Sequence, residues 1–196
     1  MKDVPIIPIV MWTAFVVIIF NSHRVGQKSQ VKVEHSMAAG VDAHMSNARE
    51  AFIKSERIPF LNEVEEVTKL LTKEAYCDDC IDSKVAKENL PRMIDLRNAY
   101  YNNDLRIETI DKVFGSIVKA LAKNHLLYTL EHIGEIKDEF YLEDAIRHLK
   151  YSMEYAPEEL REKEAIAKAT LEEALLNHNL DSADAREALE AVVTEL

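Results

Sequence analysis

Glycine and proline are scarce in this chain of 196 residues, which holds four glycines and five prolines. Beyond residue 42 the glycines are Gly115 and Gly134. A β-sheet domain needs many tight turns, and those turns favour glycine at positive φ. Alanine, leucine, glutamate and lysine, all strong helix formers, are abundant instead. We therefore predict an all-α body, a bundle or stack of about five to six antiparallel helices joined as helical hairpins.

Signatures of catalysis are also lacking. The chain has no G-x-S-x-G, no H-E-x-x-H and no glycine-rich phosphate loop. No histidine follows a glutamate at the Glu-x-x-His spacing of di-iron bundles. The acidic runs at 63–66 and 158–164 are typical of solvated helix faces. We expect neither an enzyme nor a bound cofactor.

Basic residues are outnumbered, with 24 Lys and Arg against 35 Asp and Glu, for a net charge of −11. Proteins that bind nucleic acid need a basic footprint to neutralise phosphates. The composition therefore argues against nucleic-acid binding, and the expected partners are proteins.

One long apolar run stands at the start, VPIIPIVMWTAFVVIIF over residues 4–20. As a helix it would reach about 25 Å, enough to span a bilayer core. No small-x-small cleavage site follows it directly, which favours an uncleaved signal-anchor over a cleaved leader. We predict a membrane anchor at 1–20, a flexible linker at 21–42 and an acidic all-helical domain at 43–196.

The orientation of this single-pass anchor is weakly determined. Lys2 precedes the run, whereas Arg24, Lys28 and Lys32 follow it, so the positive-inside bias is nearly balanced. A lysine directly before an apolar start is typical of export signals. This favours an extracytoplasmic, periplasmic body and leaves a cytoplasmic one open.

Apolar periodicity and capping signals place the helices of the body. Pro59 predicts a kink or break in the first, Asn102 to Asp104 an N-cap cluster for the third, and Ser182 lies in the cap of the last. The expected helices cover about 43–73, the region from Cys80 to 101, 105–133, 138–155, 157–177 and 182–196.

Residues 141–157 resemble the second helix of a tetratricopeptide repeat. The matching positions are the small Ala145 and Ser152, the large Leu149 and the closing Pro157. The preceding helix departs from the repeat pattern at Thr129, His132 and Ile133, and no second copy lies about 34 residues away. Repeat arrays need several units to bury a core, so we do not assign the chain to this family.

The two cysteines form the C-x-x-C motif Cys77-Asp-Asp-Cys80. Such a pair can be a local disulfide, half of a zinc site or a redox pair. A structural zinc needs two more ligands, and the two intervening aspartates disfavour a reactive thiolate. We favour a disulfide outside the cytoplasm. A thiol-redox role stays an alternative.

His125 and His132 lie two helical turns apart near the apolar stripe of the longest expected helix, and His148 lies on the next one. Two turns separate side chains by about 10 Å, too far for one metal ion. The alternative hypothesis is a helical haem or metal carrier or sensor that uses His125, His132 and His148. Hydrogen-bonded, partly buried histidines are the commoner explanation.

Tyr151 and Tyr155, near the end of the expected 138–155 helix, lie partly off its apolar stripe, beside Met153 on that stripe. An exposed ridge of these residue types suits a protein partner, and closure of the interhelical groove is the equal alternative. Anchor, linker, helical hairpins and this ridge together predict a membrane-anchored protein-interaction module. It would act as a scaffold or accessory subunit of a membrane complex, with self-association left open.

Overall fold

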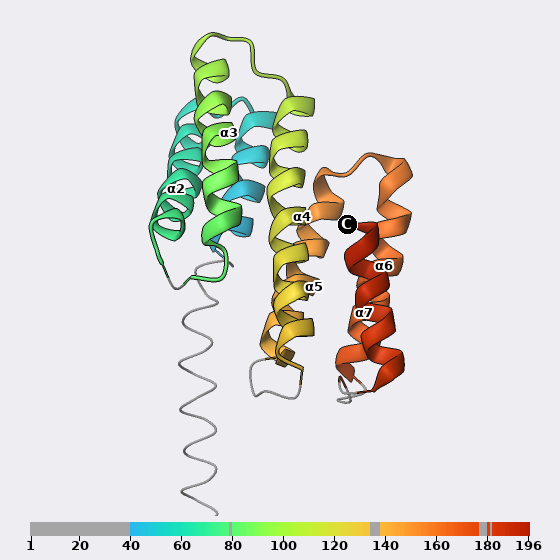
Figure 1. Cartoon of the computed structure of the whole chain (residues 1–196). Coiled ribbons are helices and arrows are strands. Elements are labelled where there is room, and N and C mark those ends of the chain that lie inside the picture. The colour runs from blue at the N-terminus through green and yellow to red at the C-terminus, as the bar shows by residue number, and fades with distance from the viewer. Residues whose placement is uncertain (1–39, 79, 134–137, 177–179, 181) are drawn as a thin grey trace, which may run out of the picture. The chain divides into compact units, whose positions relative to one another are not determined.

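The computed structural model describes residues 40–78, 80–133, 138–176, 180 and 182–196 (Figure 1). These residues contain helices and no strands, which confirms the prediction of an all-α bundle. A helix covers residues 40–53. It is followed by α2 (Arg57–Ala75), α3 (Ser83–Tyr101), α4 (Ile107–Glu131), α5 (Asp138–Tyr155), α6 (Glu158–Leu176) and α7 (Ala183–Glu195).

No helix in the described part of the chain is long and apolar enough to cross a membrane. The predicted anchor at residues 4–20 and most of the predicted linker lie outside the described residues. The last residues of the predicted linker, in contrast, are described. They already belong to the 40–53 helix, and Val41 and Asp42 are buried. The helical body thus starts a few residues earlier than predicted, because the apolar face of this helix includes Val41.

The first predicted helix is broken, but before Pro59 rather than at it. The 40–53 helix ends where Ser55 adopts a left-handed conformation, with a φ of 59°. The Glu56 amide then donates to the Ala51 carbonyl at 2.8 Å and closes that end. Pro59 lies in the first turn of α2, where its missing amide proton breaks no helical hydrogen bond.

The predicted N-cap cluster at 102–104 serves a different purpose. Asn103 adopts a φ of 57°, and the Asp104 amide donates to the Ala99 carbonyl, so these residues end α3. Helix α4 begins after Arg106, which makes no side-chain capping bond. The polar residues were correctly placed at the boundary and wrongly assigned to the later helix.

Ser182 is the N-cap of α7, and its hydroxyl oxygen accepts a hydrogen bond from the Ala185 amide at 3.1 Å. Ser182→Ala is expected to lower the free energy of unfolding by about 1 kcal/mol, because that amide loses its acceptor. Urea denaturation of the full-length chain measures the change. Ser182→Asp should retain the stability, and a loss as large as that of the alanine variant would contradict the capping role.

Two hydrophobic cores share the long helix α4, which packs against α3, α5 and α7 (Figure 1). The first core contains the 40–53 helix, α2, α3, the N-terminal part of α4 as far as Leu121, and Tyr155 of α5. The second begins at Ala122 of α4 and continues into α5, α6 and α7. The boundary between the cores therefore lies one turn before His125.

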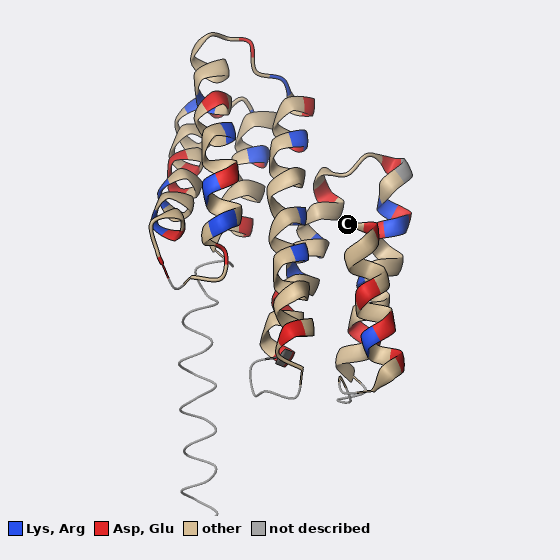
Figure 2. Cartoon of the chain, viewed as in Figure 1, with Lys and Arg blue, Asp and Glu red and all other residues tan. Residues whose placement is uncertain are grey.

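Acidic and basic residues are interleaved along the helices (Figure 2).

Candidate functional site

A layer of charged side chains lies inside the body near the boundary between the two cores. Each member except Arg147 exposes 5% or less of its surface. A buried charge costs several kcal/mol unless a partner of opposite sign compensates it. We call this set the ionic layer; it comprises Asp42, Asp82, His125, Asp144, Arg147 and His148.

The centre of the ionic layer is a row of alternating carboxylates and imidazoles. The two oxygens of Asp42 lie 2.9 and 2.8 Å from Nδ1 of His148. The His148 ring meets the His125 ring edge-on, with 5.1 Å between centroids. Nε2 of His125 lies 2.9 Å from an oxygen of Asp82. This row joins the 40–53 helix, α5, α4 and the residue that precedes α3.

Arg147 and Asn124 hold the two ends of the row. Arg147 donates from Nε to Asp42 at 3.2 Å and from Nη1 to Asp144. Asp144 in turn lies 3.7 Å from Nδ1 of His125. The Asn124 amide nitrogen donates to the second oxygen of Asp82 at 2.8 Å. Each carboxylate thereby has a partner in the layer.

The charge count of the layer favours a proton on His125, since three carboxylates are balanced by only one arginine. Burial by itself lowers the pKa of His125, but attraction and hydrogen bonding by Asp82, helped by Asp144, outweigh it and raise that pKa. Burial likewise raises the pKa of Asp82, yet His125 and Asn124 outweigh it and lower that pKa. Both shifts favour the charged forms of this pair.

These two shifts predict a stability that falls on both sides of a mildly acidic optimum. The contribution of His125 is complete below its ordinary value of 6.5 and is lost as the pH rises through its raised folded pKa. That of Asp82 is complete above its ordinary value of 3.8 and is lost as the pH falls through its lowered pKa. Urea midpoints measured from pH 3 to 9 should be highest between the two ordinary values, 3.8 and 6.5. A midpoint that rises steadily from pH 6 to 9 would contradict the pairing.

The three histidines of the metal hypothesis are not brought together. His125 and His148 meet, but the His132 ring stacks on Tyr128, and its Nδ1 lies 2.9 Å from the Tyr128 carbonyl oxygen. The two-turn separation along α4 explains this difference. Among the described residues, no group of three His, Cys, Asp or Glu is arranged to hold a metal ion. The buried imidazoles contact carboxylates instead.

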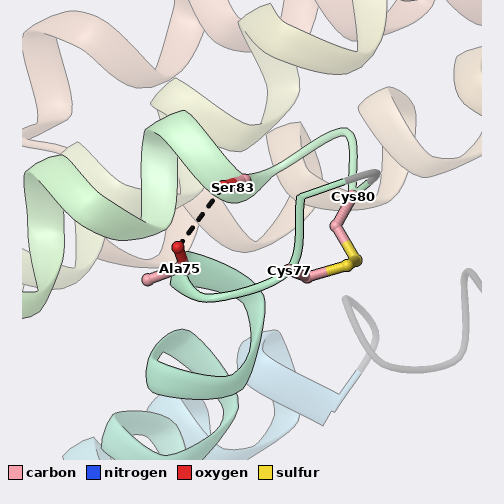
Figure 3. Close-up of a disulfide and its surroundings, with 4 residues drawn as sticks. All are labelled: Ala75, Cys77, Cys80 and Ser83. Carbon is pink, nitrogen blue, oxygen red and sulfur yellow. Dashed lines mark hydrogen bonds between the residues drawn. A yellow bond between two sulfur atoms is a disulfide. The ribbon is translucent and has the colours of Figure 1, made fainter.

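Cys77 and Cys80 form a disulfide between α2 and α3, with 5.4 Å between their Cα atoms (Figure 3). Beside it, the Ser83 hydroxyl donates to the Ala75 carbonyl at 3.5 Å, and the Ser83 amide donates to the Cys80 carbonyl at 3.1 Å. The disulfide thus lies two residues before Asp82 of the ionic layer.

The predicted tyrosine ridge is not exposed as a unit. Tyr155 is 5% exposed, and its ring packs edge-on against Phe114 with 5.7 Å between centroids. Tyr151 and Met153 are half-buried, and Tyr151 packs against the first core. The ridge fails at Tyr155 because the end of α5 crosses α4 closely: a Cβ on Gly115 would lie 3.3 Å from the Tyr155 Cβ. Partner contact through Tyr151 and Met153 stays a prediction.

Four members of the ionic layer were missed at the sequence level: Asp42, Asp82, Asp144 and Arg147. A signal existed for two of them. Asp42 shares the helix face of the buried Met45, and Asp144 lies between the buried Leu142 and Ala145. A carboxylate on an otherwise apolar helix face indicates a buried pair, but its partner is not evident from spacing.

A groove of about 650 Å³ opens between α4 and the turn from α5 to α6. Gly115, Tyr155, Ala156 and Pro157 form its small or apolar lining. Its remaining lining residues are polar or charged: Glu108, Asp111, Lys112, Ser116, Lys119, Ser152 and Arg161. This groove and the ionic layer are the two candidate sites of the body.

A buried carboxylate fixes the wall of the groove. Glu164 of α6 is 4% exposed; it lies 2.5 Å from Nζ of Lys119 on α4 and accepts a hydrogen bond from the Ser152 hydroxyl of α5 at 2.9 Å. Three helices are therefore held together beside the groove. A groove built this way is preformed, which reduces the entropy lost on binding.

Comparison of the chain with protein-family models, curated proteins and solved structures finds no match.

Proposed function

We propose that this chain is a membrane-anchored helical protein-interaction module, acting as a scaffold or accessory subunit of a membrane complex. The apolar run at residues 4–20 supports the anchor. The single observation that carries the interaction role is the preformed groove of about 650 Å³ between α4 and the α5–α6 turn.

The lining of the groove defines the chemistry of the partner. Its apolar part takes apolar side chains, as interface pockets do. Three cations and two carboxylates line it, and two of the cations are already paired, Lys119 with Glu164 and Arg161 with Glu158. Asp111 is already bound by Arg49 at 2.6 and 3.0 Å, which leaves the exposed Lys112 to meet a partner. The proposed occupant is a segment of another protein that combines an apolar face with a carboxylate.

Site-specific crosslinking in native membranes tests this assignment. A photoreactive benzoylphenylalanine at position 112 should form a defined adduct, and the same group at position 84 should not. Lys84 is an exposed lysine of α3 outside the lining of the groove and serves as the matched control. The crosslinked peptide should carry apolar residues and an acid. Equal adducts at both positions, or none at 112, would contradict the proposal.

Charge reversal at the same position supplies a second readout. Lys112→Glu should weaken the crosslinked complex by about tenfold through repulsion of the partner's carboxylate, and Lys84→Glu should leave it unchanged. Because both lysines are exposed, neither change should alter the urea midpoint of the chain.

The Cys77–Cys80 disulfide supports a body outside the cytoplasm, since disulfides persist in oxidising compartments. A membrane-impermeant maleimide applied to sealed right-side-out vesicles tests this. Labelling only after reduction would agree with an extracytoplasmic body. Labelling only after lysis, without reductant, would place the body inside.

A further inference from the structure

The disulfide loop is accessible, and hydrogen bonds from Asn124 link its end to Asp82 of the ionic layer. Cys77 and Cys80 are both half-buried, so a thiol reagent can reach them. A single residue, Ile81, separates Cys80 from Asp82. The side-chain nitrogen of Asn124 on α4 donates both to the Ile81 carbonyl at 2.9 Å and to Asp82 at 2.8 Å. The end of this loop is therefore held by the disulfide on one side and by α4 on the other.

The same loop end orients one partner of a buried ion pair. Asp82 exposes 5% of its surface and faces Nε2 of His125 at 2.9 Å. Asp82 also begins α3, because its carbonyl accepts from the Ala86 amide at 2.8 Å. A change in the loop conformation moves this carboxylate relative to an imidazole that belongs to a different, long helix.

We infer that Cys77–Cys80 is a regulatory redox site, reduced by a dithiol partner, and that its reduction is coupled to the proton on His125 through Asp82. A partner thiolate attacks one cysteine sulfur, the Cys77–Cys80 bond breaks, and a mixed disulfide forms. The partner's second thiol resolves it. Two electrons and two protons pass to the cysteines, which become thiols, and the partner becomes a disulfide.

The acidic Asp78 beside Cys77 fits a target of exchange rather than a catalyst. A nearby carboxylate disfavours the thiolate that a catalytic cysteine requires. The reduced pair is thus a poor attacking group towards other disulfides. This inference is independent of the groove and of any partner bound there.

The direction of the coupling follows from the geometry. The closed ring restricts the loop and keeps Asp82 against His125; opening it increases the freedom of the loop and weakens that contact. By linkage, a proton on His125 favours the oxidised form to the same degree. Among the described residues, the other charged groups facing His125 come from α2 and α5, and the 40–53 helix acts through His148; they are Glu74, Asp144, Arg147, His148 and Asp42.

The test is the equilibrium of the full-length chain with dithiothreitol redox buffers, measured at pH 5.5 and pH 8.0. Reduction should be about tenfold more favourable, relative to dithiothreitol, at the higher pH, equivalent to about 30 mV. His125→Gln should abolish this dependence. His44→Gln, which alters a partly exposed histidine paired with Glu63, should retain it.

A second measurement keeps the inference falsifiable should the His125 variant fail to fold. The NMR titration of His125 in the wild-type chain should move to lower pH after reduction. Identical titrations in the oxidised and reduced forms would overturn the coupling. An equilibrium constant against dithiothreitol that does not change with pH would overturn it as well.

Discussion

Replacing Asp42 by leucine is expected to lower the free energy of unfolding by about 3 to 5 kcal/mol. Asp42 is fully buried and is the carboxylate partner of the fully buried His148. Without it, Nδ1 of the buried His148 loses its carboxylate partner in the interior, and Arg147 loses one of its two carboxylates. Urea denaturation of the full-length chain near pH 6 measures the loss. Asp95→Leu, at an exposed position of α3, is the control and should change the stability by less than about 0.5 kcal/mol.

The double variant Asp42→Leu, His148→Leu shows whether the destabilisation of Asp42→Leu comes from leaving His148 without a partner or from losing the contact itself. Replacing both members of a buried pair by apolar residues leaves no unpartnered polar group in the interior, so the double variant should be more stable than Asp42→Leu alone. Arg147 is 28% exposed and can turn towards water. A single variant within about 1 kcal/mol of the wild type would show that the layer adds little.

Tyr155→Ala is expected to destabilise the chain by about 3 to 5 kcal/mol, as large-to-small changes in aromatic cores do. The ring exposes 5% of its surface and closes the first core against Phe114. Tyr151→Ala should cost clearly less, because Tyr151 is only half-buried. Thermal or urea unfolding distinguishes the two variants. Equally small losses of stability in both would support the predicted exposed ridge instead.

The hydroxyl of Tyr155 gives this prediction a second part. It is buried and has no hydrogen-bond partner among the described residues. Burial, with the negative charge of Glu154, raises the pKa of this phenol, so it stays neutral at ordinary pH. Tyr155→Phe removes an unsatisfied polar group and should be neutral or slightly stabilising. A loss above about 1 kcal/mol would indicate a hydrogen bond there.

The helices were predictable because their signals are local. Scarce glycine, apolar periodicity and the Ser182 cap depend on neighbours within a few residues. The helix break lies before Pro59 and not at it, because a left-handed Ser55 ends the helix. Serine carries no strong sequence signal for that conformation. Asn103 was assigned to the wrong helix because the same polar residues suit both a helix end and a helix start.

The ionic layer was only half predictable because its pairs are not local. The sequence favours hydrogen-bonded, partly buried histidines on the longest helix, but it places Asp42 in the linker. Asp42 meets His148 across 106 residues of chain, and Asp82 meets His125 across 43. Helical spacing determines which residues share a face, but which faces meet is decided by packing of the whole body.

The NMR titration of His125 in the oxidised full-length chain tests the central structural claim, that the body holds a protonated imidazole paired with Asp82 between two hydrophobic cores. Nitrogen-15 shifts of the ring measure its protonation as the pH is raised. We expect His125 to keep its proton above its ordinary pKa of 6.5 and to release it at lower pH in Asp82→Asn. A His125 that loses its proton at or below 6.5, unchanged in Asp82→Asn, would contradict the account, because burial alone would then govern that imidazole.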